Sequence, residues 1–234
     1  MQKAAVIVAG GRGTRMGSST PKQFLPLSGI PILVRTLKAF LEWDEKMLVA
    51  LVLPEAFLMD WYKLSSQYLR TDEASRIFLA KGGASRTESV EAGLHLLAKE
   101  IENSAACLVA IHDGVRPFIF EKVLHAAYQM AETAGAAVVC VPVKASLRRQ
   151  QEDGGSEAVD RSEYWEVQTP QIFYLAQILD AFARRPHNQF TDDASLYQAM
   201  GGRISICEGS YDNIKVTTPG DMFVAEEILK RNQT

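Results

Sequence analysis

Short β-rich runs alternate along the chain with longer segments whose apolar residues recur at helical spacing. Runs at residues 3–9, 47–53, 76–80, 107–111 and 136–141 predict strands, and the first is almost continuously apolar, as expected for a parallel strand covered on both faces. Helices are predicted after Pro31, over residues 55–69, after the capping box at residues 85–88, and over residues 121–133. This alternation predicts an α/β fold: an open, mostly parallel sheet with helices on both faces.

The alternation breaks at residues 144–164, which are polar and contain Gly154 and Gly155 in their middle. The ends of this stretch are strand-like and its middle is turn-like, so it predicts a protruding hairpin arm, an excursion that is often functional. Beyond it we expect helices at 174–184 and 193–200, short strands at 204–207 and 213–216, and a last helix capped by Thr218 with Pro219 at its first position. With no internal repeat, the chain is expected to form one domain over residues 1–234, with its arm at 142–164.

Composition narrows the classes of protein that fit this pattern. The chain has 234 residues, of which 47% are hydrophobic, and a formal net charge of −3, which argues against a nucleic-acid binder with a broad basic face. No stretch approaches the ~20 apolar residues of a membrane span. Cys107, Cys140 and Cys207 are widely spaced in apolar runs, so we expect reduced core residues of a cytoplasmic protein and no metal site among them.

The loop after the first strand carries the strongest sign of chemistry. Ligands of open α/β sheets bind beyond the carboxyl ends of the strands, and residues 9–17 (AGGRGTRMG) lie there. Closely spaced glycines let the backbone approach a phosphate, and Arg12, Arg15 and then Lys22 add positive charge. The loop is not a dinucleotide fingerprint, since Met16 replaces the third glycine, and no P-loop register fits. The alternative is a glycine turn with solvated basic residues.

Three further loops are weaker candidates. The GGASRTES loop runs into a helix N-terminus, where anions bind well, but a simple capped turn is equally expected. Asp113 follows a buried strand and could hold Mg²⁺, although a structural pair with Arg116 is the alternative; His112 beside it is expected to be packed or hydrogen-bonded. Lys215 near the end of the chain is either solvated or part of the site, and whether Asp212 reaches the same metal is open.

Taken together, these loops resemble the 2-C-methyl-D-erythritol 4-phosphate cytidylyltransferases of the non-mevalonate isoprenoid pathway. The matching strings, in family order over nearly the whole chain, are AGGRGTRMG, PKQF, GGASRTESV, HDGVRP, VDRSEYWEVQTPQIF, TDDAS and DNIKVTTP. The resemblance implies a Rossmann-like nucleotidyltransferase fold and a homodimer joined through the arm. It also implies that CMP is transferred from CTP, with Mg²⁺, to 2-C-methyl-D-erythritol 4-phosphate, giving 4-diphosphocytidyl-2-C-methyl-D-erythritol and pyrophosphate.

The same resemblance assigns roles to particular residues. Arg15 and Lys22 would be catalytic cations at the triphosphate, and Lys215 would contact the α-phosphate. The nucleotide would be held by Ala9, Gly10, Gly11, Arg12, Gly13, Gly83, Ser89, Asp113 and Gly114. Ser146 and Arg161 on the arm, with Thr191, would bind the methylerythritol phosphate, partly across the dimer interface. Asp113 and Asp212 are the candidate metal ligands.

These roles agree with the chemistry of the reaction. A substrate phosphate is already mostly dianionic near neutral pH, so it needs no general base. It needs in-line placement at the α-phosphorus and positive charge where the transition state and the leaving pyrophosphate accumulate negative charge.

The sequence departs from the family pattern at a few positions, and three rival functions remain to be weighed. Ala84 and Ala145 stand where the family has acidic residues, and HDGVR replaces the usual HDAAR, so the changes touch the acceptor side more than the triphosphate loops.

A ribitol-5-phosphate cytidylyltransferase shares the loops, but VDRSEYWEVQTPQ and TDDAS favour methylerythritol phosphate. A non-catalytic nucleotide-binding protein would be expected to have lost Arg15, Lys22 or Lys215. A dinucleotide oxidoreductase is disfavoured by Met16.

Overall fold

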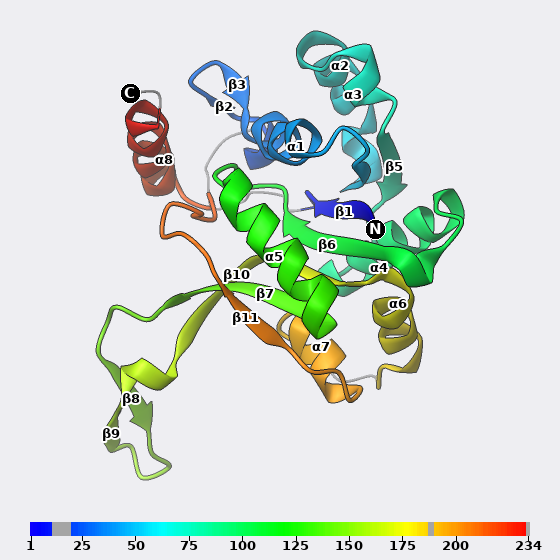
Figure 1. Ribbon diagram of the computed structural model, residues 1–234. Helices are drawn as coiled ribbons and strands as arrows, with labels where there is room; N and C mark the ends of the chain where they lie inside the picture. Colours follow the sequence, from blue (N-terminus) through cyan, green and yellow to red (C-terminus); the bar gives the residue numbers. More distant parts are fainter. Residues whose placement is uncertain (11–19, 187–189, 233–234) are drawn as a thin grey trace.

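A computed structural model describes residues 1–10, 20–186 and 190–232 of the protein. Within these ranges one seven-stranded sheet organises the chain, in the order β11-β7-β10-β6-β1-β4-β5 (Figure 1). Its strands are β1 (Gln2–Val8), β4 (Leu48–Leu53), β5 (Ile77–Lys81), β6 (Cys107–Asp113), β7 (Ala136–Pro142), β10 (Trp165–Tyr174) and β11 (Ser205–Glu208). Strand β10 runs antiparallel to both of its neighbours, and the other pairings are parallel, so the expected mostly parallel sheet is confirmed.

Helices cover both faces of this sheet because successive strand residues point to opposite sides. In β1, Ala5 and Ile7 pack in the cluster that contains α1 (Ile32–Trp43) and α5 (Glu121–Ala134), with Trp61 of α2 (Leu58–Tyr68). Ala4 and Val6 face the opposite cluster, which contains α4 (Arg86–Glu100), α6 (Leu175–Arg184) and α7 (Asp193–Ala199). The strong apolar character of β1 therefore follows from its burial between two helical layers.

A third, smaller cluster lies beside the sheet and ties the last helix to the body. Helix α8 (Pro219–Arg231) contributes Ala225 and Ile228, which pack against Leu27 of the β2–β3 ribbon (Pro26–Leu27 and Ile30–Pro31). Val216, just before α8, is fully buried in the same cluster. Short turns of helix complete the chain at η2 (Lys22–Phe24), η3 (Glu55–Phe57), α3 (Thr71–Ala74), η4 (Ser104–Ala106) and η5 (Arg161–Glu163).

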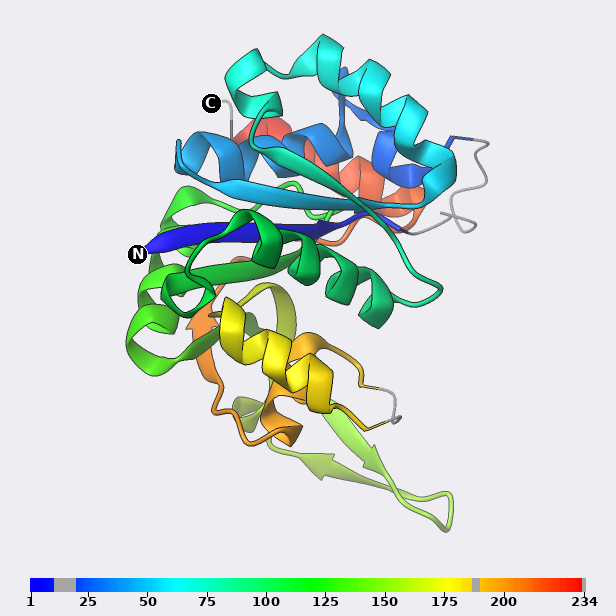
Figure 2. The same ribbon diagram turned by 90° about the vertical axis from the view of Figure 1, so that its right-hand side faces the viewer.

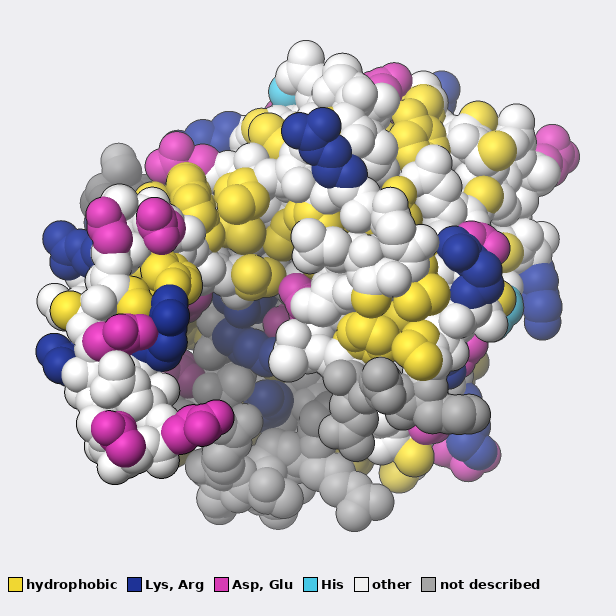
Figure 3. All heavy atoms as spheres, turned by 90° about the horizontal axis from the view of Figure 1, so that it is seen from below, with side chains coloured by type: hydrophobic (Ala, Val, Ile, Leu, Met, Phe, Trp, Pro, Cys, Tyr) yellow, Lys and Arg dark blue, Asp and Glu magenta, His cyan; other side chains and the backbone are white. Residues whose placement is uncertain are grey.

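The predicted arm is present and stands away from the sheet. Strands β8 (Leu147–Gln150) and β9 (Ser156–Val159) pair only with each other, antiparallel, and project from the body in both ribbon views (Figures 1 and 2). At the base of the arm, the Tyr211 hydroxyl donates a hydrogen bond of 2.7 Å to the Pro142 carbonyl. Seen from below, Lys and Arg side chains lie in the hollow between the arm and the rest of the chain (Figure 3).

The structure corrects several expectations about local elements. Strand β10 was not predicted, because Gln168, Thr169, Pro170 and Gln171 interrupt its apolar pattern; the ladder between β10 and β7 is irregular between Val167 and Gln171. The strand predicted at 213–216 is wrong, since this segment forms no ladder.

Two helix starts also differ from the prediction. The helix predicted at 55–69 begins as η3 before α2. At α4, Ser85 accepts the Glu88 N–H as predicted, but the Glu88 carboxylate accepts from the Ala84 N–H instead of closing the capping box.

No helix in the described part of the chain is long and apolar enough to cross a membrane.

Candidate active site

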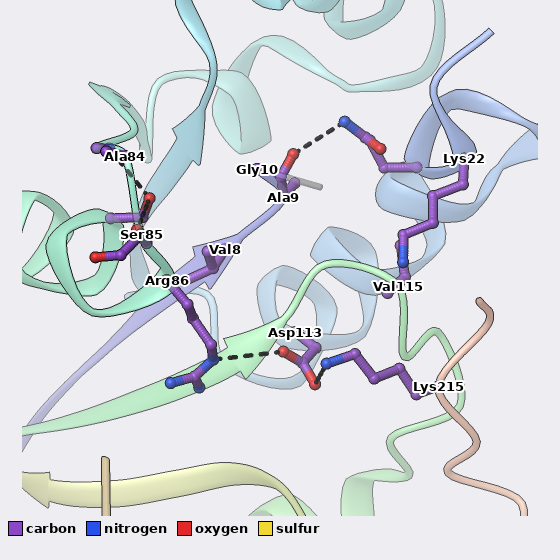
Figure 4. A pocket seen from close by; sticks show the side chains of 13 residues that line it. Val8, Ala9, Gly10, Lys22, Ala84, Ser85, Arg86, Asp113, Val115 and Lys215 are labelled. Carbon is purple, nitrogen blue, oxygen red and sulfur yellow. Dashed lines mark hydrogen bonds and ion pairs between the residues drawn. The ribbon is translucent and has the colours of Figure 1, made fainter. Parts of the chain in front are cut away.

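A cavity of about 280 Å³ opens at the carboxyl ends of β1, β5 and β6. This is the edge at which ligands of open α/β sheets bind. The predicted site residues that line it come from four separate loops (Figure 4): Ala9, Gly10, Lys22, Gly83, Ser89, Asp113 and Lys215. The structure thus brings together part of the predicted site, and Gly114 lies just outside the lining residues. The predicted residues Gly11, Arg12, Gly13 and Arg15 lie outside the described residues.

Two glycines allow the segments around this cavity to pack closely. The Gly114 N–H donates to the Val8 carbonyl at 2.9 Å, and a Cβ on Gly114 would stand 2.9 Å from the Ala9 Cβ. Gly83 is similarly constrained, because a Cβ there would stand 2.4 Å from the Glu88 Cβ. Only glycine therefore allows the β6 loop to lie so close to the end of β1, and the β5 loop so close to the first turn of α4.

Ser89 connects the β5 loop to the first turn of α4. Its hydroxyl donates to the Ser85 carbonyl at 2.9 Å and accepts the Gly83 N–H at 3.1 Å, and the residue is 4% exposed. These two bonds fix the backbone of the loop at the cavity wall. The predicted nucleotide-binding residues Gly83 and Ser89 therefore act as one structural unit.

Asp113 is the electrostatic centre of the cavity. Its Oδ2 lies 3.0 Å from Lys215 Nζ and 3.2 Å from Arg116 Nε, and its Oδ1 lies 4.0 Å from Arg86 Nε. Burial acts to raise the pKa of Asp113, but Lys215, Arg116 and Arg86 outweigh it and lower that pKa to about 2. The carboxylate is therefore ionised at any physiological pH. Asp113 forms the pair with Arg116 that was the structural alternative, and it also lines the cavity.

His112 is a structural histidine, as expected from the sequence. It is fully buried, and its ring nitrogens share hydrogen bonds of 3.0 Å with Thr169 Oγ1 and the Arg116 carbonyl. Burial lowers the pKa of His112 to about 4, so the ring is neutral near pH 7.

Arg86 and Gln23 are cavity residues that the sequence did not single out. Arg86 Nη2 lies 2.7 Å from Asp193 Oδ2, which places a guanidinium between two acidic side chains at the wall. Gln23 is fully buried and donates from Nε2 to the Ala9 carbonyl at 2.9 Å, which anchors the end of β1. Both stand inside strings that were recognised, SRTES and PKQF, but arginine and glutamine there have no distinctive spacing that would mark them.

Comparison with known proteins decides which family has this arrangement. The family model of 2-C-methyl-D-erythritol 4-phosphate cytidylyltransferase matches residues 3–231. The enzyme of that name from Bacteroides thetaiotaomicron is 41% identical over 98% of this chain and all of its own length. The enzyme from Bacillus velezensis is 40% identical over 98% of this chain and 97% of its own length.

The chain belongs to the 2-C-methyl-D-erythritol 4-phosphate cytidylyltransferase family.

Solved structures agree with this membership of the cytidylyltransferase family. The chain resembles the 4-diphosphocytidyl-2C-methyl-D-erythritol synthase of Anaerococcus prevotii with a TM-score of 0.84, at 25% identity, over 98% of this chain and 96% of the other. It resembles the 2-C-methyl-D-erythritol 4-phosphate cytidylyltransferase of Thermus thermophilus with a TM-score of 0.75, at 29% identity, over 98% and 100%. The nucleotidyltransferase fold expected from the sequence is confirmed.

Family membership also settles the reaction. As a cytidylyltransferase of this family, the protein transfers CMP from CTP to 2-C-methyl-D-erythritol 4-phosphate, and releases pyrophosphate. The assignment is supported over ribitol-5-phosphate cytidylyltransferase, over a non-catalytic nucleotide-binding protein and over a dinucleotide oxidoreductase.

Three residues that were predicted to bind the acceptor stand apart from this cavity. Ser146, Arg161 and Thr191 are exposed, and the cavity is lined by other described residues. A guanidinium nitrogen of Arg161 donates to the Lys144 carbonyl at the base of the arm, and Thr191 Oγ1 lies 3.4 Å from Ser195 Oγ beside α7. A single chain therefore does not gather the whole predicted site.

Asp212, the second candidate metal ligand, is also placed elsewhere. Its carboxylate pairs with Arg231 of α8 and borders a different hollow, next to Phe120 and Glu121. Among the described residues, no group of three or more His, Cys, Asp or Glu side chains is arranged to hold a metal ion. Asp113 is thus the metal-ligand candidate that the cavity itself offers.

Proposed function

We propose that the cavity binds the triphosphate of CTP, and that Lys22 and Lys215 stabilise the charge that develops at the α-phosphate. The observation that carries this proposal is the convergence of these two lysines with Asp113 at the ends of β1 and β6 (Figure 4). Gly83 and Ser89 form the opposite wall, where the rest of the nucleotide would lie. Arg15 belongs to the same proposal as a second cation of the glycine-rich loop.

The roles proposed for the lysines follow from the negative charges of the two substrates. The attacking group is a phosphate dianion, so approach to CTP brings two anions together. Lys215 pairs with Asp113 while its side chain is 42% exposed, so the ammonium group can reach a phosphate that enters the cavity. A preorganised cation at this place lowers the barrier by stabilising the transition state and the leaving pyrophosphate.

A magnesium ion fits the donor set of the cavity. Mg²⁺ is usually held by one or two carboxylates together with substrate phosphates and water. Asp113 supplies one ionised carboxylate, and its Oδ1 is the less engaged oxygen, with Arg86 Nε at 4.0 Å. When bound, the ion would neutralise charge on the phosphates and help to align them. Asp212, with its carboxylate on Arg231, would have to reach the site by a rearrangement.

We further propose that a second copy of the chain completes the acceptor site through residues 142–164. Ser146 and Arg161 lie on an arm that projects from the body, where a partner protomer can meet them (Figure 2). Exposed Tyr164, Trp165 and Val167 at the base of the arm give that partner apolar surface to bury. Arg161 would then bind the phosphate of the methylerythritol substrate, for which a guanidinium is well shaped.

A hybrid-dimer experiment tests this shared site. Lys215→Ala chains and Arg161→Ala chains are each expected to be poorly active alone. If Arg161 acts across the interface, each hybrid dimer contains one intact site, so random mixing restores about a quarter of the wild-type sites. If both residues serve the same protomer, mixing restores nothing, and the shared site is refuted.

The proposal includes a cytoplasmic location. The thiols of Cys107, Cys140 and Cys207 are free and buried. Disulfides are typical of oxidising compartments, so unpaired core cysteines agree with a reducing one.

A further inference from the structure

Lys215 stands on a segment that has no regular structure to hold it. The strand predicted at 213–216 is absent, so ladder hydrogen bonds do not fix the backbone there. A lysine ammonium stands at the end of a flexible four-carbon stem, so it can be held in one place only if the backbone below it is fixed. The position of this catalytic candidate must therefore depend on contacts made by its neighbours.

On one side of Lys215, fully buried Val216 donates its N–H to the Val115 carbonyl at 2.9 Å, and on the other side Asn213 makes the side-chain contacts. Asn213 is fully buried, and its Nδ2 donates to the Thr169 carbonyl at 2.8 Å and to Gln168 Oε1 at 3.1 Å. Its own carbonyl accepts from Arg116 Nη1 at 2.7 Å. Side-chain amide bonds thus tie this segment to strand β10 in place of a ladder.

The same contacts reach the other half of the cavity. Thr169, whose carbonyl accepts from Asn213, also accepts the Asp113 N–H on its Oγ1 at 3.1 Å. Arg116 bridges the Asn213 carbonyl and Asp113 Oδ2. One connected set of hydrogen bonds therefore holds both Asp113 and the segment that carries Lys215, whose side chains lie 3.0 Å apart.

We infer that Asn213 is a positioning residue for Lys215: its amide holds the 210–216 segment so that the lysine ammonium faces the α-phosphate of the nucleotide. This inference rests on the proposed role of Lys215. Asn213 itself touches no substrate, since it is fully buried and stands outside the cavity lining.

Loss of positioning should affect transfer more than binding. A misplaced cation still attracts the triphosphate through space, but it no longer matches the charge of the transition state. Asn213→Ala is therefore expected to lower kcat about 10-fold to 100-fold, a range typical of misplacements near 1 Å. The KM for CTP should change about threefold or less.

A double-variant experiment separates positioning from general damage. Rates of Asn213→Ala, Lys215→Ala and the double variant are measured with radiolabelled CTP at high enzyme concentration, so that slow turnover remains measurable. If Asn213 acts through Lys215, adding Asn213→Ala to Lys215→Ala lowers kcat no further. Multiplicative losses, with the double variant slower by the product of both factors, overturn the inference.

Controls keep the test decisive. Tyr128→Phe removes another fully buried hydrogen bond, of 2.7 Å to the Ala4 carbonyl at the far end of β1, and should lower thermal stability without lowering kcat. If Asn213→Ala does not fold, Gln168→Met loosens the same segment, since Gln168 Nε2 donates to the Ser210 carbonyl at 2.9 Å, and the same non-additivity is expected. A Lys215→Ala variant with wild-type kcat would instead refute the role proposed for Lys215.

Discussion

At the scale of single residues, the site is built from a few charges whose partners are already in place. Asp113 is paired with Lys215 and Arg116, and its carboxylate remains ionised because these cations outweigh the effect of burial. Lys22 lines the same cavity as the first residue of η2. The consequence is a preorganised field that does not have to form during the reaction.

The role of Lys22 can be tested by kinetics. Lys22→Ala should lower kcat far more than it weakens CTP binding, because the charge that Lys22 meets accumulates mainly in the transition state. Steady-state kinetics with varied CTP measures both quantities. A raised KM with unchanged kcat would contradict a transition-state role.

The buried histidine predicts a pH dependence of stability. The pKa of His112 is lowered by burial to about 4, whereas an unfolded histidine titrates near 6.5. The unfolded state therefore binds more protons between these values, so the stability contributed by neutral His112 is present above pH ~6.5 and is lost as the pH falls towards 4. The total loss is about 3 kcal/mol in the free energy of unfolding.

Urea unfolding between pH 7 and pH 4 measures this effect. Wild type should lose stability more steeply than His112→Asn, which has no imidazole to protonate. Parallel curves for the two proteins would show that His112 does not control the acid sensitivity.

At the scale of elements, the glycine of α4 controls how closely the helix approaches the sheet. A Cβ on Gly93 would stand 2.5 Å from Val6 Cγ1 and 2.9 Å from Val52 Cγ2. The helix therefore packs directly on β1 and β4, and its N-terminus delivers Ser89 and Arg86 to the cavity.

Gly93→Ala should therefore destabilise the protein by about 1–3 kcal/mol, the usual cost of overpacking a core. Gly220→Ala is a matched control in α8, because its Cβ would meet nothing closer than Thr218 Oγ1 at 3.7 Å. That control should be neutral or stabilising by up to about 1 kcal/mol. Chemical denaturation of both variants decides between the two expectations.

Some strands could be predicted from the sequence and others could not. Strands β1, β4 and β6 were predictable because their apolar runs record burial on both faces. Strand β10 was not predictable, because Gln168, Thr169 and Gln171 interrupt its apolar pattern. Their polar groups make long-range hydrogen bonds that no local pattern reveals; Gln171 Oε1, for example, accepts the Ala194 N–H. The segment at 213–216 has strand-like residues, yet Asn213 binds β10 through its side chain and leaves the backbone irregular.

The same distinction applies to the site. Gly10, Gly83, Asp113 and Lys215 could be located from the sequence, and they line the cavity, whereas Asp212 lies elsewhere. Arg86 and Gln23 could not, because their roles depend on partners more than a hundred residues away, as for Arg86 with Asp193, or on the Ala9 carbonyl.

At the scale of the whole molecule, the protein consists of a sheet-based body and an arm, and the arm holds residues proposed for the acceptor site away from the body. The body alone gathers Lys22, Asp113 and Lys215, whereas Arg161 stands on the arm (Figures 1 and 4). This separation is what leads to the proposed homodimer. Of the departures from the family pattern, Ala145 lies on the arm, whereas Ala84 and Val115 line the cavity, so the expectation that the departures lie mainly away from the cavity is wrong.

The most direct test of the whole account is pyrophosphate release from CTP and Mg²⁺ with two alternative acceptors. We expect clear turnover with 2-C-methyl-D-erythritol 4-phosphate and a much lower kcat/KM with ribitol 5-phosphate. A preference for ribitol 5-phosphate, or release with neither acceptor, would contradict the assigned function.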